Sequence, residues 1–192
     1  MNCFENEKIK DLKLRNEVIS DREYIDCEFY NCNFIDVDFN NCLFKDCKFH
    51  NCTMNGIRFK FSVMKNAILD GSDFISINWN TLKGDSIGAE PINTVRECFF
   101  KYNNFILMKL NKVKFSSSKF QESLFENCDL IEADFKDTRF ESTQFIQCNM
   151  EKADFRGAHG YVIDIQSNKL KKAKFSFPEV INLLNSIDIV ID

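Results

Sequence analysis

Residues 27–52 read CEFYNCNFIDVDFNNCLFKDCKFHNC, and in this stretch a large apolar side chain recurs at every fifth position. These side chains belong to Phe29, Phe34, Phe39, Phe44 and Phe49. A spacing of five fits neither the 3.6-residue period of an α-helix nor the two-residue period of a β-strand. The stretch therefore predicts a chain that changes direction after each short extended piece.

The same spacing extends over most of the chain. One series of central positions runs from Tyr24 to Trp79 and a second from Phe100 to Phe155, and all 24 positions are apolar or aromatic. They include 16 of the 21 phenylalanines. We expect the aromatic members to form an inward-facing core stack: Phe29, Phe34, Phe39, Phe44, Phe49, Phe59, Phe74, Trp79, Phe100, Phe105, Phe115, Phe120, Phe125, Phe135, Phe140, Phe145 and Phe155.

The residues around each centre explain how the chain can turn. Two positions before a centre the side chain is mostly small, and two positions after it, in the first series, Asp, Asn, Gly and Ser dominate. Those residues accept tight turns. Four such pentads would close a square coil of about 20 residues, and coils would stack as parallel β-bridges about 4.8 Å apart. The sequence therefore predicts an all-β solenoid of about seven coils.

This pattern, a small residue followed two positions later by Phe, Leu or Met, resembles the pentapeptide-repeat family over residues 22–157. The resemblance implies a right-handed quadrilateral β-helix. The C-terminal sequence GYVIDIQSNKLKKAKFSFPEVINLLNSIDIVID is similar to that of the fluoroquinolone-resistance branch of the family. That similarity implies a homodimer formed by this region, and a DNA-mimicking protein that binds DNA gyrase or topoisomerase IV.

We divide the chain into an N-terminal cap (1–21), the β-helix (22–157) and a C-terminal extension (158–192), with an irregular coil at 80–97. The 21-residue gap between Trp79 and Phe100 indicates a one-residue bulge near Gly84–Pro91, with Trp79 beneath Phe100. The extension should contain a helix with Pro178 in its first turn. Its apolar stripe would either form the dimer interface or cap its own chain: Val180, Ile181, Leu183, Leu184 and Ile187.

The motif Gly84-Asp85-Ser86-Ile87-Gly88 has the form G-x-S-x-G. A nucleophile elbow needs a strand before it, a helix after it and a histidine within reach. Because His50 and His159 are the only histidines and both are expected elsewhere, the motif favours a loop. We expect this loop to contact a partner through Gly84, Asp85, Ser86, Gly88 and Glu90.

Eight of the nine cysteines occupy the small inward position, which favours buried thiols over disulfides or a metal site. Their C-x4-C spacing places successive cysteines on different faces, whereas zinc needs converging ligands. We therefore expect no metal and no cofactor. With no signal peptide and no apolar run long enough to span a membrane, the sequence favours a cytoplasmic protein.

The charge of the chain and of its faces restricts the classes of function that the protein can have. The chain has 25 basic and 29 acidic residues. Grouping the pentads by face gives net charges of −1, −1, −2 and +2. Duplex DNA carries one negative charge per roughly 1.7 Å, so mimicry of DNA by charge would be weak. A filled prism also offers no concave site for a substrate or other small molecule. Two hypotheses remain: a non-enzymatic, rod-like protein-interaction module, or a topoisomerase-binding protein of the resistance type.

Overall fold

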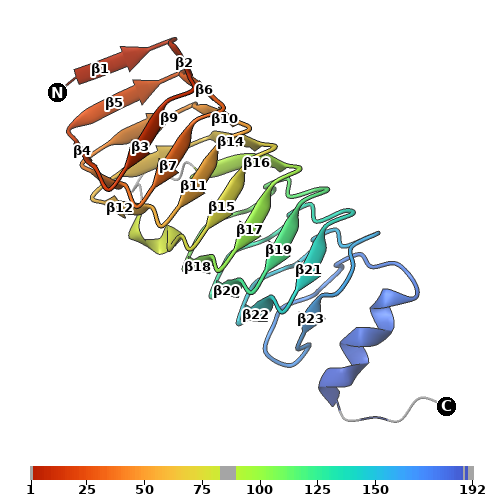
Figure 1. Ribbon diagram of the computed structural model, residues 1–192. Helices are drawn as coiled ribbons and strands as arrows, with labels where there is room; N and C mark the ends of the chain where they lie inside the picture. The colour runs from red at the N-terminus through yellow and green to blue at the C-terminus, as the bar shows by residue number, and fades with distance from the viewer. Residues whose placement is uncertain (1, 83–89, 188, 190–192) are drawn as a thin grey trace.

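The computed structural model describes residues 2–82, 90–187 and 189, which form a parallel β-solenoid (Figure 1). Each short strand pairs in parallel with the strand one coil away. Phe29 pairs with Phe49 in this way, and Met54 pairs with Phe34 on one side and with Phe74 on the other. The chain visits four faces in turn, which we name A, B, C and D. The predicted fold class is confirmed.

The strands are assigned to faces by their pairing. Face A contains β1 (Asn2–Glu5), β5 (Arg22–Ile25), β9 (Leu43–Lys45) and β13 (Val63–Lys65). Face B contains β2 (Lys8–Lys10), β6 (Glu28–Tyr30), β10 (Lys48–His50), β14 (Ala67–Asp70) and β16 (Ile92–Arg96). Face C contains β3 (Lys13–Arg15), β7 (Asn33–Ile35), β11 (Thr53–Asn55), β15 (Asp73–Ile75), β17 (Phe99–Lys101), β19 (Lys119–Gln121) and β21 (Arg139–Glu141). Face D contains β4 (Val18–Ser20), β8 (Asp38–Asn40), β12 (Arg58–Lys60), the 3-10 helix η1 (Trp79–Thr81), β18 (Asn104–Ile106), β20 (Leu124–Glu126), β22 (Gln144–Ile146) and β23 (Val162–Ile163).

Faces A and B continue toward the C-terminus through isolated β-bridges instead of full strands. On face A, Lys109 pairs with Asp129, and on face B, Lys114 pairs with Asp134. The rod therefore keeps four faces along its length.

The side chains at all 24 central positions are buried. Between coils the rings stack, as Phe105 does on Phe125 with centroids 4.6 Å apart and planes 7° apart. Within a coil they meet edge to face, as Phe120 and Phe125 do at 5.4 Å and 61°. Both are favourable aromatic geometries, and burial of each ring contributes roughly 1.5–3 kcal/mol. The interior is thus filled with side chains.

The corners between faces adopt the left-handed backbone conformation. Asn31 has a φ of 52°, and its N–H donates to the carbonyl of His50 in the next coil, 3.0 Å away. At Gly56, with a φ of 65°, a Cβ atom would also collide with the carboxylate of Asp36. Asn, Asp and Gly tolerate this conformation best, which explains why they recur two positions after most centres of the first series.

The N-terminal segment 1–21 is part of the solenoid and not the separate cap that we expected. Its described residues form a further coil, β1 to β4, in register with β5 to β8. The centres of this coil continue the five-residue spacing at Phe4, Ile9, Leu14 and Ile19. The solenoid therefore begins one coil earlier than the sequence interpretation places it.

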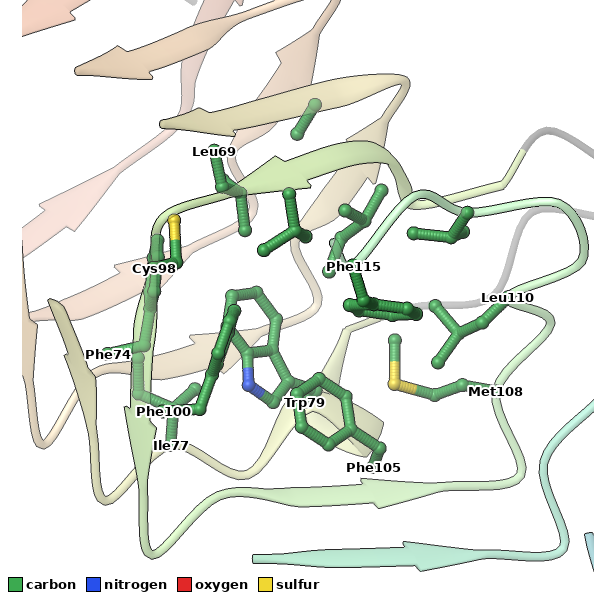
Figure 2. Close-up of a cluster of buried hydrophobic side chains, with 14 of the residues drawn as sticks. Leu69, Phe74, Ile77, Trp79, Cys98, Phe100, Phe105, Met108, Leu110 and Phe115 are labelled. Atoms are coloured by element: carbon green, nitrogen blue, oxygen red, sulfur yellow. The ribbon is translucent and has the colours of Figure 1, made fainter. Parts of the chain in front are cut away.

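The predicted register across the irregular coil is wrong. Phe100 pairs with Phe74, and not with Trp79. Trp79 instead stacks on Phe105, with centroids 5.7 Å apart and planes 8° apart (Figure 2). Because Met54 pairs with Phe74 over 20 residues and Phe74 with Phe100 over 26, the irregular coil has six extra residues, not one.

A buried amide accommodates the tryptophan in this coil. The indole Nε1–H of Trp79 donates to Oδ1 of Asn103 at 2.9 Å. Nδ2 of Asn103 donates in turn to the carbonyls of Phe74 and Lys101. A buried indole N–H needs an acceptor, which explains why Asn103 occupies an inward position that holds a small residue in most pentads.

The coils also extend beyond residue 157, where we expected the C-terminal extension to begin. Lys169 pairs with Asn149 and Lys174 with Asp154. The expected helix is present as the 3-10 helix η2 (Glu179–Ile187), which follows Pro178 at the end of the rod (Figure 1).

We expect Phe125→Asp to destabilise the protein by at least about 4 kcal/mol, because it removes a fully buried ring and places a carboxylate among other rings. Gln144→Asp, at an outward position on the adjacent strand, should change the free energy of unfolding by about 0.5 kcal/mol or less. Urea unfolding followed by circular dichroism measures both. Equal tolerance of the two substitutions would contradict the inward assignment of Phe125.

Candidate interaction surface

The outward side chains form ion-pair ladders that run from coil to coil. On face B, Glu28 lies 2.8 Å from Nζ of Lys48 and 3.6 Å from Nζ of Lys8. The hydroxyl of Tyr30 also donates to Glu28 at 2.6 Å. Lys48 and Tyr30 together lower the pKa of Glu28 to about 2. This carboxylate is held by neighbours on its own face.

On face D, Asp38 is buried between two basic side chains of the next coil. Oδ2 of Asp38 accepts from Nζ of Lys60 at 2.8 Å, and Oδ1 accepts from Nε of Arg58. Burial by itself would raise the pKa of Asp38, but the bonds from Lys60 and Arg58 outweigh burial and lower it. Asp38 therefore presents little free negative charge.

The two histidines lie in similar ladders. His50 stacks on Tyr30 with centroids 4.9 Å apart, and its Nδ1 is 3.1 Å from Oδ2 of Asp70. His159 lies 3.4 Å from Oε1 of Glu179. The first interaction joins neighbouring coils of face B, and the second joins a coil to η2.

The predicted partner-binding loop lies mainly outside the described residues, which include none of Gly84, Asp85, Ser86 and Gly88. Glu90 is described and is partly buried, and its Oε1 accepts from Nδ2 of Asn111 at 3.5 Å. Burial raises the pKa of Glu90. The contact of this segment with a partner stays a prediction.

Eight cysteines are buried, and all nine are free thiols. The buried sulfurs donate to main-chain carbonyls, as Sγ of Cys47 does to Tyr24 at 3.3 Å. Burial raises the pKa of Cys47 and of Cys98 to about 12. Within the described residues, no group of three or more His, Cys, Asp or Glu side chains is arranged to hold a metal ion.

A shallow hollow of about 430 Å³ lies on the corner between faces A and B near the C-terminal end. Its lining combines three carboxylates and three ammonium groups: Glu132, Asp134, Lys152, Asp154, Lys172 and Lys174. Lys152 is bonded to Glu132 at 2.9 Å. The hollow is part of the charged ladder, and none of the residues that line it is one of the hydrophobic or aromatic residues that predominate in small-molecule sites.

Two exposed apolar side chains stand out on the corner that follows face D. Phe61 and Leu107 are 75% and 76% exposed, and their φ angles are 53° and 57°. Asn41 and Asn127 occupy equivalent corners. A bulky residue in this conformation strains the backbone. Because these two side chains are exposed, they make few packing contacts that could offset the strain. The sequence reasoning missed these residues, although both depart from the turn-forming pattern.

The predicted dimer-interface residues lie on η2. Leu183 packs against the core of its own chain. Val180, Leu184 and Ile187 are partly buried, and Ile181 is exposed. The segment therefore covers the end of the solenoid and leaves part of its apolar surface accessible.

The family model described as "Pentapeptide repeats (8 copies)" matches the chain at residues 27–60, 42–78 and 109–145. The structure of full-length QnrB1, a plasmid-mediated fluoroquinolone resistance protein, is similar with a TM-score of 0.72 and 14% identity, covering 98% of this chain and 100% of that chain. A trypsin-treated QnrB1 variant gives a TM-score of 0.73 at 15% identity, covering 100% and 99%. At this identity the likeness shows a shared fold.

No curated protein sequence matches the chain significantly. Among the described residues, no helix has the length and apolar character needed to cross a membrane.

We expect one thiol per native chain, that of exposed Cys3, to react rapidly with Ellman's reagent, and all nine to react after denaturation. The other eight are buried, so the reagent cannot reach their sulfur atoms while the coils stay closed. Cys3→Ser should abolish the rapid phase. Fast reaction of several thiols in that variant would show that the coils open readily.

Proposed function

The chain belongs to the pentapeptide-repeat family, and we propose that it acts as a rigid, non-enzymatic rod that binds another protein. The observation that carries this proposal is the filled interior, because it leaves the flat outer faces as the surfaces for recognition. Flat, extended surfaces of stacked repeats are suited to protein partners.

A second candidate function is binding of DNA gyrase or topoisomerase IV, with protection against fluoroquinolones. Its support is the likeness to QnrB1 over essentially the whole of both chains. We propose in addition that η2 mediates a homodimer, as the sequence resemblance implies. The free thiols fit a reducing, cytoplasmic location.

Electrostatics favours the first candidate over a DNA mimic. The six extra residues of the irregular coil regroup the pentads, and every face is then close to neutral. Many carboxylates are also paired, as Glu132 is with Lys112 and Lys152. A topoisomerase that recognised this rod would therefore depend on its shape more than on its charge.

The interaction function can be tested by placing a photoreactive amino acid at one outward position on each face. Suitable positions are Glu151 on face A, Ser116 on face B, Gln121 on face C and Leu107 beside face D. Irradiation of cells should yield a discrete adduct with another protein from at least one position. Mass spectrometry identifies the partner, and absence of any such adduct from all four faces would contradict a protein-binding rod.

The topoisomerase candidate is tested by titrating the protein into gyrase supercoiling assays with and without a fluoroquinolone. Protection of supercoiling from the drug is expected if this candidate is correct. Gln144→Asp serves as a folded surface variant, and Phe125→Asp serves as an unfolded control. If a large molar excess of the protein neither protects gyrase from the drug nor inhibits supercoiling, this candidate is excluded. The first candidate does not depend on that result.

A further inference from the structure

Exposed apolar side chains gather on one face of the rod. Of the nine large hydrophobic residues that are exposed in the described part of the chain, five lie on face D or on the corner that follows it. They are Val18, Phe61, Leu107, Ile146 and Val162. Tyr102 lies on the corner that leads into face D, and the other three belong to the C-terminal segment. The described parts of faces A and B carry none of them.

The C-terminal half of face D is also poor in charge. The outward residues of β18, β20, β22 and β23 are amides and aliphatic residues, with Glu126 as the exception: Asn104, Ile106, Leu124, Glu126, Gln144, Ile146 and Val162. The same coils of face B carry Lys114, Asp134, Lys136, Asp154 and Arg156. Depletion of charge and enrichment in apolar groups are typical of the centre of a protein interface.

The order of the rungs on face D determines what can lie against it. Its eight rungs are β4, β8, β12, η1, β18, β20, β22 and β23, which follow one another along one side of the rod (Figure 1). A twofold axis across the rod, between η1 and β18, exchanges the first rung with the eighth and the third with the sixth. Two antiparallel rods related by this axis would meet face to face.

This symmetry brings complementary residues together. Lys60 on the third rung and Glu126 on the sixth both come directly after a buried centre, so each would face the other across the axis. Lys60 shares Asp38 with a second basic side chain of its own rung, so the third rung keeps a net positive charge. Val18 on the first rung and Val162 on the eighth both come directly before a centre and would also meet. Across this axis, face D therefore offers one ion pair and one apolar contact to a second copy, and each occurs twice.

We propose that face D binds face D of a second copy of this chain, with the two rods antiparallel. Eight rungs about 4.8 Å apart and about five residues wide give a projected area of roughly 600 Å² per chain, near the lower end for specific interfaces. The contact is therefore a concentration-dependent dimer. It is distinct from association through η2 and does not depend on the partner proposed above.

Sedimentation velocity of the full chain from about 1 to about 200 µM tests the proposal. Glu126→Lys places like charges opposite each other twice per dimer and should weaken association at least about tenfold. Adding Lys60→Glu to this variant should restore most of the affinity. Glu151→Lys, which follows a centre on face A and is similarly exposed, should leave association unchanged.

Two further variants separate association from folding. Phe61→Asn and Leu107→Asn remove apolar surface but introduce a residue that favours the left-handed corner, so thermal stability should be kept or raised while the dimer weakens. In a Cys3→Ser background, Lys60→Cys combined with Glu126→Cys should give a disulfide-linked dimer on oxidation.

A chain that stays monomeric over the whole concentration range would overturn the proposal. Equal effects of Glu126→Lys and Glu151→Lys on association would also overturn it. So would a result in which Ile181→Asp on η2 abolishes association while every face D variant retains it.

Discussion

The structure depends on the stacking of buried side chains at every fifth residue from one coil to the next. Each ring, as in the Phe105–Phe125 pair, lies over an equivalent ring while its backbone forms parallel bridges to the same coil. The two interactions require the same register, so each supports the other. Because these side chains fill the interior, function is left to the outer faces.

The corners impose a second constraint, since each one needs a left-handed residue. Asn, Asp and Gly meet this requirement in most of the first coils, and the ladder of corner hydrogen bonds satisfies the backbone there. Phe61 and Leu107 meet it less well and expose their side chains. Strained residues cluster where a protein binds or acts, and these two lie beside the face with the most exposed apolar surface.

Charge on the faces is arranged in local pairs instead of one extended field. Glu28, Asp38 and Glu132 each contact basic residues of neighbouring coils. Surface pairs of this type add little stability individually, but they neutralise the faces on which they lie. Recognition of a partner would then depend on shape and on apolar contacts, and the exposed apolar residues are concentrated on face D and the corner that follows it.

The sequence by itself determined the period, the solenoid and the identity of the buried centres, because a repeat of five sets which side chains face inward within each pentad. It did not determine which pentads share a face beyond the irregular coil: the spacing places Trp79 beneath Phe100, whereas Trp79 lies against Phe105. For the same reason, the sequence could not predict that the exposed apolar residues gather on face D. Local spacing sets the direction of a side chain, whereas the stacking of distant coils depends on the total length of chain between them, and only the tertiary structure shows that six additional residues separate the coils here.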